Sequence, residues 1–276
     1  MIVSRLSPMP DEAEIIRSRS NPAFKRLAQL KERGGEDLAL VEGVKLLNDA
    51  LDAGVRIREG AVSPRLLETA RGRDLLESLA RKGAAVRIVD DRLLSSISEV
   101  ETSQGLVAIA ERPAFTPAQL FRGTPLLLVA VGVQNPGNLG GLLRAAEAAG
   151  ATGALLTEGT ADPFSWKALR GSMGSAFRLP HLRGLTIRSA LALLKAQGVS
   201  TIAAYATASV RYDEADLRGA AAFLFGNEGS GLPSEVMQAA DQRVGIPMQG
   251  GVESLNVSVA AGILLFEAAR QRRLSR

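Results

Sequence analysis

The sequence contains no cysteine and only one histidine, His181. Without cysteine the chain has no disulfide framework, no thiolate metal site and no cysteine nucleophile, which excludes pyrimidine C5 methylation through a covalent cysteine adduct. A single histidine also argues against a histidine-rich metal site and against Ser-His-Asp catalysis. We therefore expect no metal, and any catalysis must use carboxylates, amides, hydroxyls, arginines or main-chain groups.

Aromatic residues and long apolar runs are scarce as well. Aromatics make up 4% of the chain, so RNA binding through a wide stacking platform is not expected. No apolar run reaches the roughly 18 to 20 residues that span a membrane. The start, residues 1–14, has no positive segment leading into an apolar stretch, unlike a secretory signal. These absences predict a soluble, cytoplasmic protein without a membrane partner.

The net charge of +4 comes entirely from the C-terminal part of the chain. Residues 1–115 hold 18 basic and 18 acidic side chains, and the remainder holds 15 and 11. Positive charge concentrated in one part of a chain is compatible with a polyanionic partner such as a nucleic acid.

The length of 276 residues, 46% of them hydrophobic, suits two modest domains. Up to residue 113, expected strands and helices alternate and predict a compact α/β/α domain. The strands are expected at 38–41, 57–62, 86–89 and 105–110, and the helices at 23–31, 43–53, 65–81 and 92–97. Residues 114–124 lie in a proline-containing stretch without periodicity, which predicts a linker.

A second α/β domain is expected over residues 125–276. Leu126–Val131 is a continuous apolar run, typical of a parallel strand that is covered on both faces. The last predicted helix, 255–270, is apolar nearly all round in its first turns, so we expect it to be buried in a core or a subunit interface. Further strands are expected at 154–157, 202–206 and 222–225, and further helices at 139–149 and 188–197.

Three glycine-rich polar loops follow or adjoin these strands, at 132–141, 226–231 and 246–256. In an open parallel sheet, ligands bind at the carboxyl ends of the strands. The first two loops fit neither a Walker loop nor the Gly-x-Gly-x-x-Gly pattern, which argues against a nucleotide-dependent enzyme of those classes acting on small molecules. Main-chain amides exposed in three such loops are suited to hold a nucleoside with a charged tail.

The three loops resemble, in the same order, the signature motifs of the SpoU/TrmH family of SPOUT methyltransferases. Asn135–Arg144 matches Asn-Pro-x-Asn-x-Gly-x-x-x-Arg, and Gly226–Gly231 matches Gly-x-Glu-x-x-Gly. The third motif, Ile-Pro-Met followed by Ser-Leu-Asn-Val-Ser, is found within 246–258. The N-terminal part is more loosely similar to the L30e-like substrate-binding domain of this family, on Asn21-Pro22, Lys25-Arg26 and Glu42-Gly43.

The resemblance implies a C-terminal parallel sheet threaded into a trefoil knot, with S-adenosylmethionine bound in the knotted loops. It also implies a homodimer through the C-terminal domain, and methyl transfer to a ribose 2′-hydroxyl of structured RNA. Ribosomal RNA is favoured over transfer RNA, because an L30e-like domain suggests a folded hairpin or internal loop as the target. The alternatives are a transfer-RNA ribose methyltransferase and a catalytically silent RNA-binding or ribosome-assembly protein that keeps the knot.

By this resemblance, the expected catalytic residues are Asn138, Arg144, Glu228, Ser254 and Asn256. Family proposals make the arginine that matches Arg144 the general base. A guanidinium is always protonated in proteins, which disfavours that role, so we favour a phosphate clamp. The family often has threonine directly after this arginine, whereas the chain has Ala145.

The resemblance also implies cofactor-binding and RNA-binding residues. The cofactor is expected to contact Ala204, Tyr205, Ala206, Gly226, Asn227, Ile246, Met248 and Leu255. For Ile246 and Leu255, ordinary core packing is an equally good interpretation. The expected RNA-binding residues are Arg19, Lys25, Arg26 and Arg144. A solvated helix face is the alternative for the first three, and a surface or packing role is expected for His181.

Overall fold

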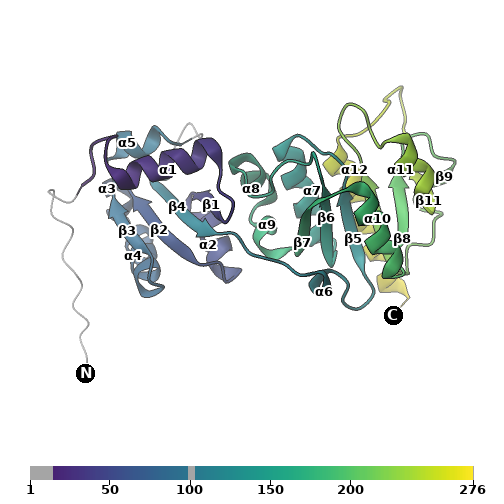
Figure 1. Ribbon diagram of the computed structural model, residues 1–276, viewed down its shortest axis with the longest axis horizontal. Helices are drawn as coiled ribbons and strands as arrows, with labels where there is room; N and C mark the ends of the chain where they lie inside the picture. The colour runs from purple at the N-terminus through teal and green to yellow at the C-terminus, as the bar shows by residue number, and fades with distance from the viewer. Residues whose placement is uncertain (1–14, 99–102, 276) are drawn as a thin grey trace. The chain divides into compact units, whose positions relative to one another are not determined.

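The computed structural model describes residues 15–98 and 103–275. The chain divides into two compact units, Met1–Pro113 and Ala114–Arg276, drawn in Figure 1. Residues 1–14, on which the expectation of no secretory signal rests, lie outside the described residues. Within the described ranges, no helix is long and apolar enough to cross a membrane.

The first unit is built on a four-stranded mixed sheet in the order β1-β4-β2-β3. Its strands are β1 (Leu38–Glu42), β2 (Ile57–Val62), β3 (Ala85–Ile88) and β4 (Leu106–Glu111). Its helices are α1 (Pro22–Arg33), α2 (Val44–Asp52), α3 (Pro64–Leu67), α4 (Ala70–Arg81) and α5 (Asp91–Ser95). The expected alternation is confirmed, but the helix expected over 65–81 is two helices. Thr69 separates them, because its backbone is extended and its hydroxyl accepts a hydrogen bond from Gly72 N at 3.0 Å.

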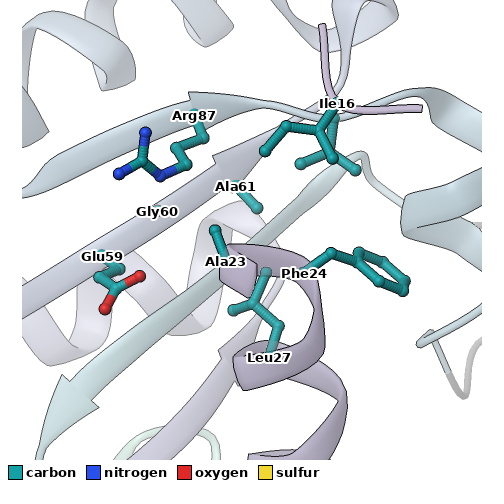
Figure 2. Close-up of a pocket in the computed structure, with 9 residues that line it drawn as sticks. Ile16, Ala23, Phe24, Leu27, Glu59, Gly60, Ala61 and Arg87 are labelled. Atoms are coloured by element: carbon teal, nitrogen blue, oxygen red, sulfur yellow. The ribbon is translucent and has the colours of Figure 1, made fainter. Parts of the chain in front are cut away.

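A small crevice lies between α1 and the strands β2 and β3 (Figure 2). Ala23, Phe24 and Leu27 of α1 line it on one side, and Ala61 of β2 lines it on the other. The space of about 10 Å³ holds at most a single water molecule. This crevice is therefore too small to hold a nucleotide.

The second unit is built on a seven-stranded sheet in the order β7-β6-β5-β10-β8-β11-β9, in which every pairing is parallel. This confirms the parallel α/β fold. Its strands are β5 (Leu126–Ala130), β6 (Gly153–Thr157), β7 (His181–Leu185), β8 (Ser200–Ala204), β9 (Val210–Arg211), β10 (Ala221–Phe225) and β11 (Gln242–Gly245). Its helices are α6 (Pro117–Leu120), α7 (Pro136–Ala148), α8 (Trp166–Ser172), α9 (Ser175–Arg178), α10 (Ile187–Ala196), α11 (Ser234–Ala239) and α12 (Val257–Leu274).

Helices cover both faces of this sheet. Every residue of β5 and of β10 is buried, as the continuous apolar runs predicted. On one face, Ala190 and Leu194 of α10 pack with Leu127, Val129 and other buried side chains of the sheet. On the other face, α12 packs against α7 and β10. Figure 1 shows α10 and α12 on opposite faces of the sheet.

The linker prediction is wrong for part of its range, and the single chain tests only part of the prediction that the last helix is buried in a core or a subunit interface. The stretch expected as a linker contains α6, whose Leu120 is fully buried next to β6. The last helix buries only one face within the single chain: Ala261, Leu264 and Leu265 are inside, whereas Val259 and Phe266 are 51% and 49% exposed. The trefoil knot implied by the resemblance stays a prediction.

Candidate active site

The site lies at the carboxyl ends of four adjacent strands, β5, β10, β8 and β11. Because the strands are parallel and in register, with Phe225 beside Ala130 and Ala204 beside Val244, their ends meet at one edge. The three glycine-rich loops continue from these ends: the first from β5, the second from β10 and the third from β11. The strand order thus brings the first motif, at 132–141, next to two motifs that lie much later in the sequence, at 226–231 and 246–256.

The first motif begins α7 through a side-chain cap. Asn135 is the N-cap residue, and its Oδ1 accepts hydrogen bonds from Gly137 N at 2.8 Å and Asn138 N at 3.2 Å. Pro136 then occupies the first turn, where its lack of an N–H group costs nothing. The cap fixes the start of α7, and therefore the position of Asn138 beside the second motif.

The carboxylate of Glu228, in the second motif, binds the first motif through three hydrogen bonds. Its Oε1 accepts from Asn135 N at 3.1 Å and from Asn138 Nδ2 at 2.9 Å, and its Oε2 accepts from Gln134 N at 3.3 Å. Partial burial raises the pKa of Glu228, but hydrogen bonds from Asn138 and from main-chain N–H groups outweigh this and hold it below its ordinary value. Glu228 is therefore an ionised carboxylate at neutral pH that orders the first loop.

The third motif joins this network through Asn256. Its Nδ2 donates to Asn138 Oδ1 at 2.9 Å, and its Oδ1 accepts from Ser258 N at 3.0 Å as the N-cap of α12. Helices α7 and α12 approach closely at this point: a β-carbon added at Gly141 of α7 would lie 2.8 Å from the Cβ of Ser258 in α12. Glu228, Asn138 and Asn256 thus form one chain of hydrogen bonds through all three motifs.

The second motif is a tight turn that requires a glycine. Asn227 and Gly231 exchange main-chain hydrogen bonds of 3.1 and 2.9 Å, and Asn227 Nδ2 donates to Gly132 O at 3.0 Å. A β-carbon at Gly226 would lie only 2.2 Å from the Gly231 carbonyl carbon. Gly226 therefore cannot be exchanged for any other residue without moving the turn.

The residues expected to bind the cofactor lie around the ends of β8, β10 and β11. Ala204, Gly226 and Asn227 are half-buried at strand ends, and Ala206 is exposed just beyond β8. Ile246 and Met248 are half-buried after β11. Tyr205 and Leu255 are 48% and 36% exposed, so within the single chain Leu255 is not a core residue.

Arg144 lies on the exposed surface of α7, six residues or about 1.7 turns after Asn138. Of the residues that the structure describes, none forms a hydrogen bond or ion pair with its side chain. Ser254 is exposed in the third loop, and Ala145 is half-buried on α7.

The expected RNA-binding residues of the first unit are all on its surface. Arg19 and Lys25 are exposed. Arg26 is also exposed, but its guanidinium forms an ion pair with Glu59 at 2.5 Å, which offsets part of its charge. Of the three, Arg26 is therefore the least available to a phosphate group.

Sequence reasoning missed the main-chain donors of Gln134 and Asn135 and the cap formed by Asn135. The Asn-Pro pair was a usable signal for the cap, since proline favours the first helical position. His181 is buried, with its ring 4.9 Å from that of Phe115 and 5.4 Å from that of Phe164, so of the two expected roles it has the packing role and not the surface role. No cluster of residues able to hold a metal ion occurs within 15–98 and 103–275.

Comparison with known proteins agrees with this geometry. The SpoU rRNA Methylase family matches residues 125–266, and the MRM3-like substrate binding domain matches residues 21–108. The 23S rRNA (guanosine(2553)-2′-O)-methyltransferase RlmP of Bacillus subtilis (strain 168) is 33% identical over 243 residues, which cover 88% of this chain and 93% of that relative.

Solved structures are similar over both units. The SpoU methyltransferase AviRb of Streptomyces viridochromogenes in complex with AdoMet has a TM-score of 0.84 at 27% identity, over 93% of this chain and 100% of the other. The AdoMet-bound rRNA methyltransferase of Sinorhizobium meliloti has a TM-score of 0.79 at 32% identity, over 93% and 98%.

Proposed function

This chain belongs to the SpoU rRNA methylase family, and from that premise we propose that it transfers a methyl group from S-adenosylmethionine to a ribose 2′-hydroxyl of ribosomal RNA. The observation that carries the proposal is the chain of hydrogen bonds from Glu228 through Asn138 to Asn256, which joins the three family motifs at one edge of the sheet. Relatives named as 23S rRNA 2′-O-methyltransferases favour ribosomal RNA over transfer RNA.

The cofactor is S-adenosylmethionine, and the ends of β8, β10 and β11 suit it. Main-chain groups there, beside side-chain-free Gly226 and half-buried Ala204, can hydrogen-bond an adenine, while exposed Tyr205 and Leu255 offer apolar surface. Ile246, Met248, Asn227 and Ala206 complete the expected set. When bound, S-adenosylmethionine supplies an electrophilic methyl group on a sulfonium sulfur.

The polar residues then divide into two roles. Glu228, Asn138 and Asn256 are engaged with one another, so we assign them the task of holding the loops in place. Ionised Glu228, with its lowered pKa, is a poor general base at neutral pH. The Arg144 guanidinium has no partner among the described residues and is suited to clamp a phosphate, with that phosphate assisting removal of the hydroxyl proton. Ser254 lies in the exposed third loop, where it can contact the ribose.

The role of Arg144 is tested by Arg144→Lys. Lysine keeps the charge but loses the planar, bidentate fork, so we expect kcat to fall about tenfold or more. The slope of the rate against pH should stay as in the wild type, because the substitution preserves the positive charge. A near-normal rate would contradict a clamp that needs the planar fork.

We also propose a homodimer formed through the C-terminal unit. Val259 and Phe266 on α12, with Val252 and Leu255 before it, expose apolar surface that a second copy can cover. The N-terminal unit, which matches a substrate-binding domain, is assigned to RNA capture. The cytoplasm, where ribosomal RNA is found in bacteria, is the proposed location.

The function is tested by incubating the protein with labelled S-adenosylmethionine and unmodified total RNA, then mapping 2′-O-methylation at single-nucleotide resolution. One labelled ribosomal position that is lost in Arg144→Ala is the expected result. Label in transfer RNA would keep the reaction and overturn the substrate. Absence of cofactor binding would leave the silent RNA-binding protein as the function.

A further inference from the structure

Helix α8 packs against α7 with almost no side chain between the two backbones. A β-carbon at Gly140 of α7 would lie 2.5 Å from Ala168 O, and one at Gly171 of α8 would lie 3.0 Å from Gly137 O. Arg144 follows Gly140 by one turn on the same side of α7. The close contact therefore places Gly171, the neighbour of Arg170, directly against Gly137 of the first motif.

The exposed face of α8 is basic. Lys167 and Arg170 are its two exposed residues, and three positions apart they lie on one side of the helix. Like charges at this spacing repel each other and weaken a helix. Local stability therefore does not explain the pair.

No acidic residue of these two helices neutralises the cations. Helix α8 has no acidic residue, and the only one in α7, Glu147, is held by Arg178 through hydrogen bonds of 2.6 and 2.9 Å. Across the described part of the chain, the side chains of Lys167, Arg170 and Arg144 form no hydrogen bond or ion pair. Three positive charges without a partner among the described residues thus lie on two helices that are in direct contact at the first motif.

We propose that Lys167 and Arg170, together with Arg144, form a phosphate-binding surface that holds the RNA strand on either side of the target nucleotide. The inference rests on the proposed function and names how that site grips its substrate. An RNA backbone supplies regularly spaced anions, which several cations on one surface can bind at once. Lys167 and Arg170 are positioning residues, because they contact phosphates and not the reacting atoms.

The test compares Lys167→Ala, Arg170→Ala and the double variant with the wild type. Arg188→Ala is the matched control, since Arg188 is an exposed arginine without a partner among the described residues, on α10 at the opposite face of the sheet. Affinity for an unmodified 23S rRNA transcript is measured by filter binding between 50 and 300 mM salt (roughly the range over which phosphate contacts weaken). The KM and kcat for methyl transfer are measured on the same transcript.

Each alanine variant should lower the slope of log affinity against log salt by about 0.7 to 0.9, and weaken binding about fivefold at about 0.15 M salt. KM should rise in step, while kcat stays within about twofold. Arg170→Lys should restore most of the affinity, because a phosphate accepts either cation. Arg188→Ala should match the wild type.

An unchanged salt slope and KM in the double variant would overturn the surface, and methylation by the wild type would leave the proposed function intact. If the wild type methylates no RNA, the proposed function fails, and the salt slope still decides the surface. Normal binding of the transcript combined with lost methylation of ribosomal particles would assign the cations to an acidic protein partner and overturn the phosphate assignment.

Discussion

Replacing Glu228 with glutamine is the most direct test of how the three motifs are held together. Glutamine keeps the shape of the side chain and removes its charge. The two oxygens of Glu228 accept from Gln134 N, Asn135 N and Asn138 Nδ2. The glutamine amide has only one oxygen, so its NH₂ group must face a main-chain N–H and one hydrogen bond is lost.

The expected loss can be estimated from these bonds. A hydrogen bond to a charged group contributes about 1.5 to 3 kcal/mol, and a neutral one about 0.5 to 1.5 kcal/mol. Glu228 is exposed, and water competes for its donors, so we take the lower end and expect a loss of about 1 to 2 kcal/mol. If this free energy orders the loops on ligand binding, the Kd for S-adenosylmethionine should rise about 5- to 30-fold.

The assay is titration calorimetry of S-adenosylmethionine with the wild type, Glu228→Gln and the control Glu235→Gln. Glu235 is an exposed carboxylate on α11, outside the hydrogen-bond network. The pKa of Glu228 is lowered in the fold, so its contribution is present above the ordinary carboxylate pKa and is lost as the pH falls through the folded value. Binding by the wild type should therefore weaken in acid more than binding by the glutamine variant. A Kd for Glu228→Gln within twofold of the wild type at pH 7 would refute the assigned role.

Three further predictions follow from close contacts and from burial. Gly226→Ala should abolish cofactor binding, because the added carbon would lie 2.2 Å from a main-chain atom. Gly219→Ala is the control: its added carbon would meet no atom within 4 Å, so this variant should bind the cofactor normally in the same titration. Gly140→Ala should lower the free energy of unfolding by about 1 to 3 kcal/mol through overpacking against α8, and denaturant unfolding beside Gly219→Ala measures this. Burial lowers the pKa of His181 to about 4, so the unfolded state binds the extra proton and stability should fall by up to about 3 kcal/mol as the pH drops from about 6.5 to 4. A His181→Asn variant should lose that pH dependence. If the free energy of unfolding of the variant falls as steeply with decreasing pH as that of the wild type, the assignment to His181 is refuted.

Much of the C-terminal fold could be predicted because its strongest signals are local. A continuous apolar run such as Leu126–Val131 is compatible with few structures other than a strand covered on both faces, and β5 has that environment. The motifs at Asn138, Glu228 and Asn256 were assigned one site from resemblance, and the structure brings these side chains into hydrogen-bond contact. Their catalytic roles stay predictions.

The remaining features, such as the strand order, depend on long-range contacts that local sequence patterns do not predict. The position of β10 between β5 and β8 is a pairing of distant segments, and periodicity has no information about which strands pair. The prediction of one continuous helix over 65–81 is wrong, because the preference of Thr69 for an N-cap position outweighs the continuous helical pattern. Strand β7 was not predicted, because Arg183 and Gly184 interrupt its apolar sequence.

The bond between Asn138 and Asn256 has a consequence for how the protein folds. It joins residues 118 positions apart, and closing a loop of that size costs roughly 4 kcal/mol of chain entropy before any contact compensates it. Pairings of such long range form slowly. The methyl-donor site should therefore be among the last parts of the chain to become ordered during refolding, later than the first unit with its shorter loops. The time at which cofactor binding recovers during refolding would then report when the native state is complete.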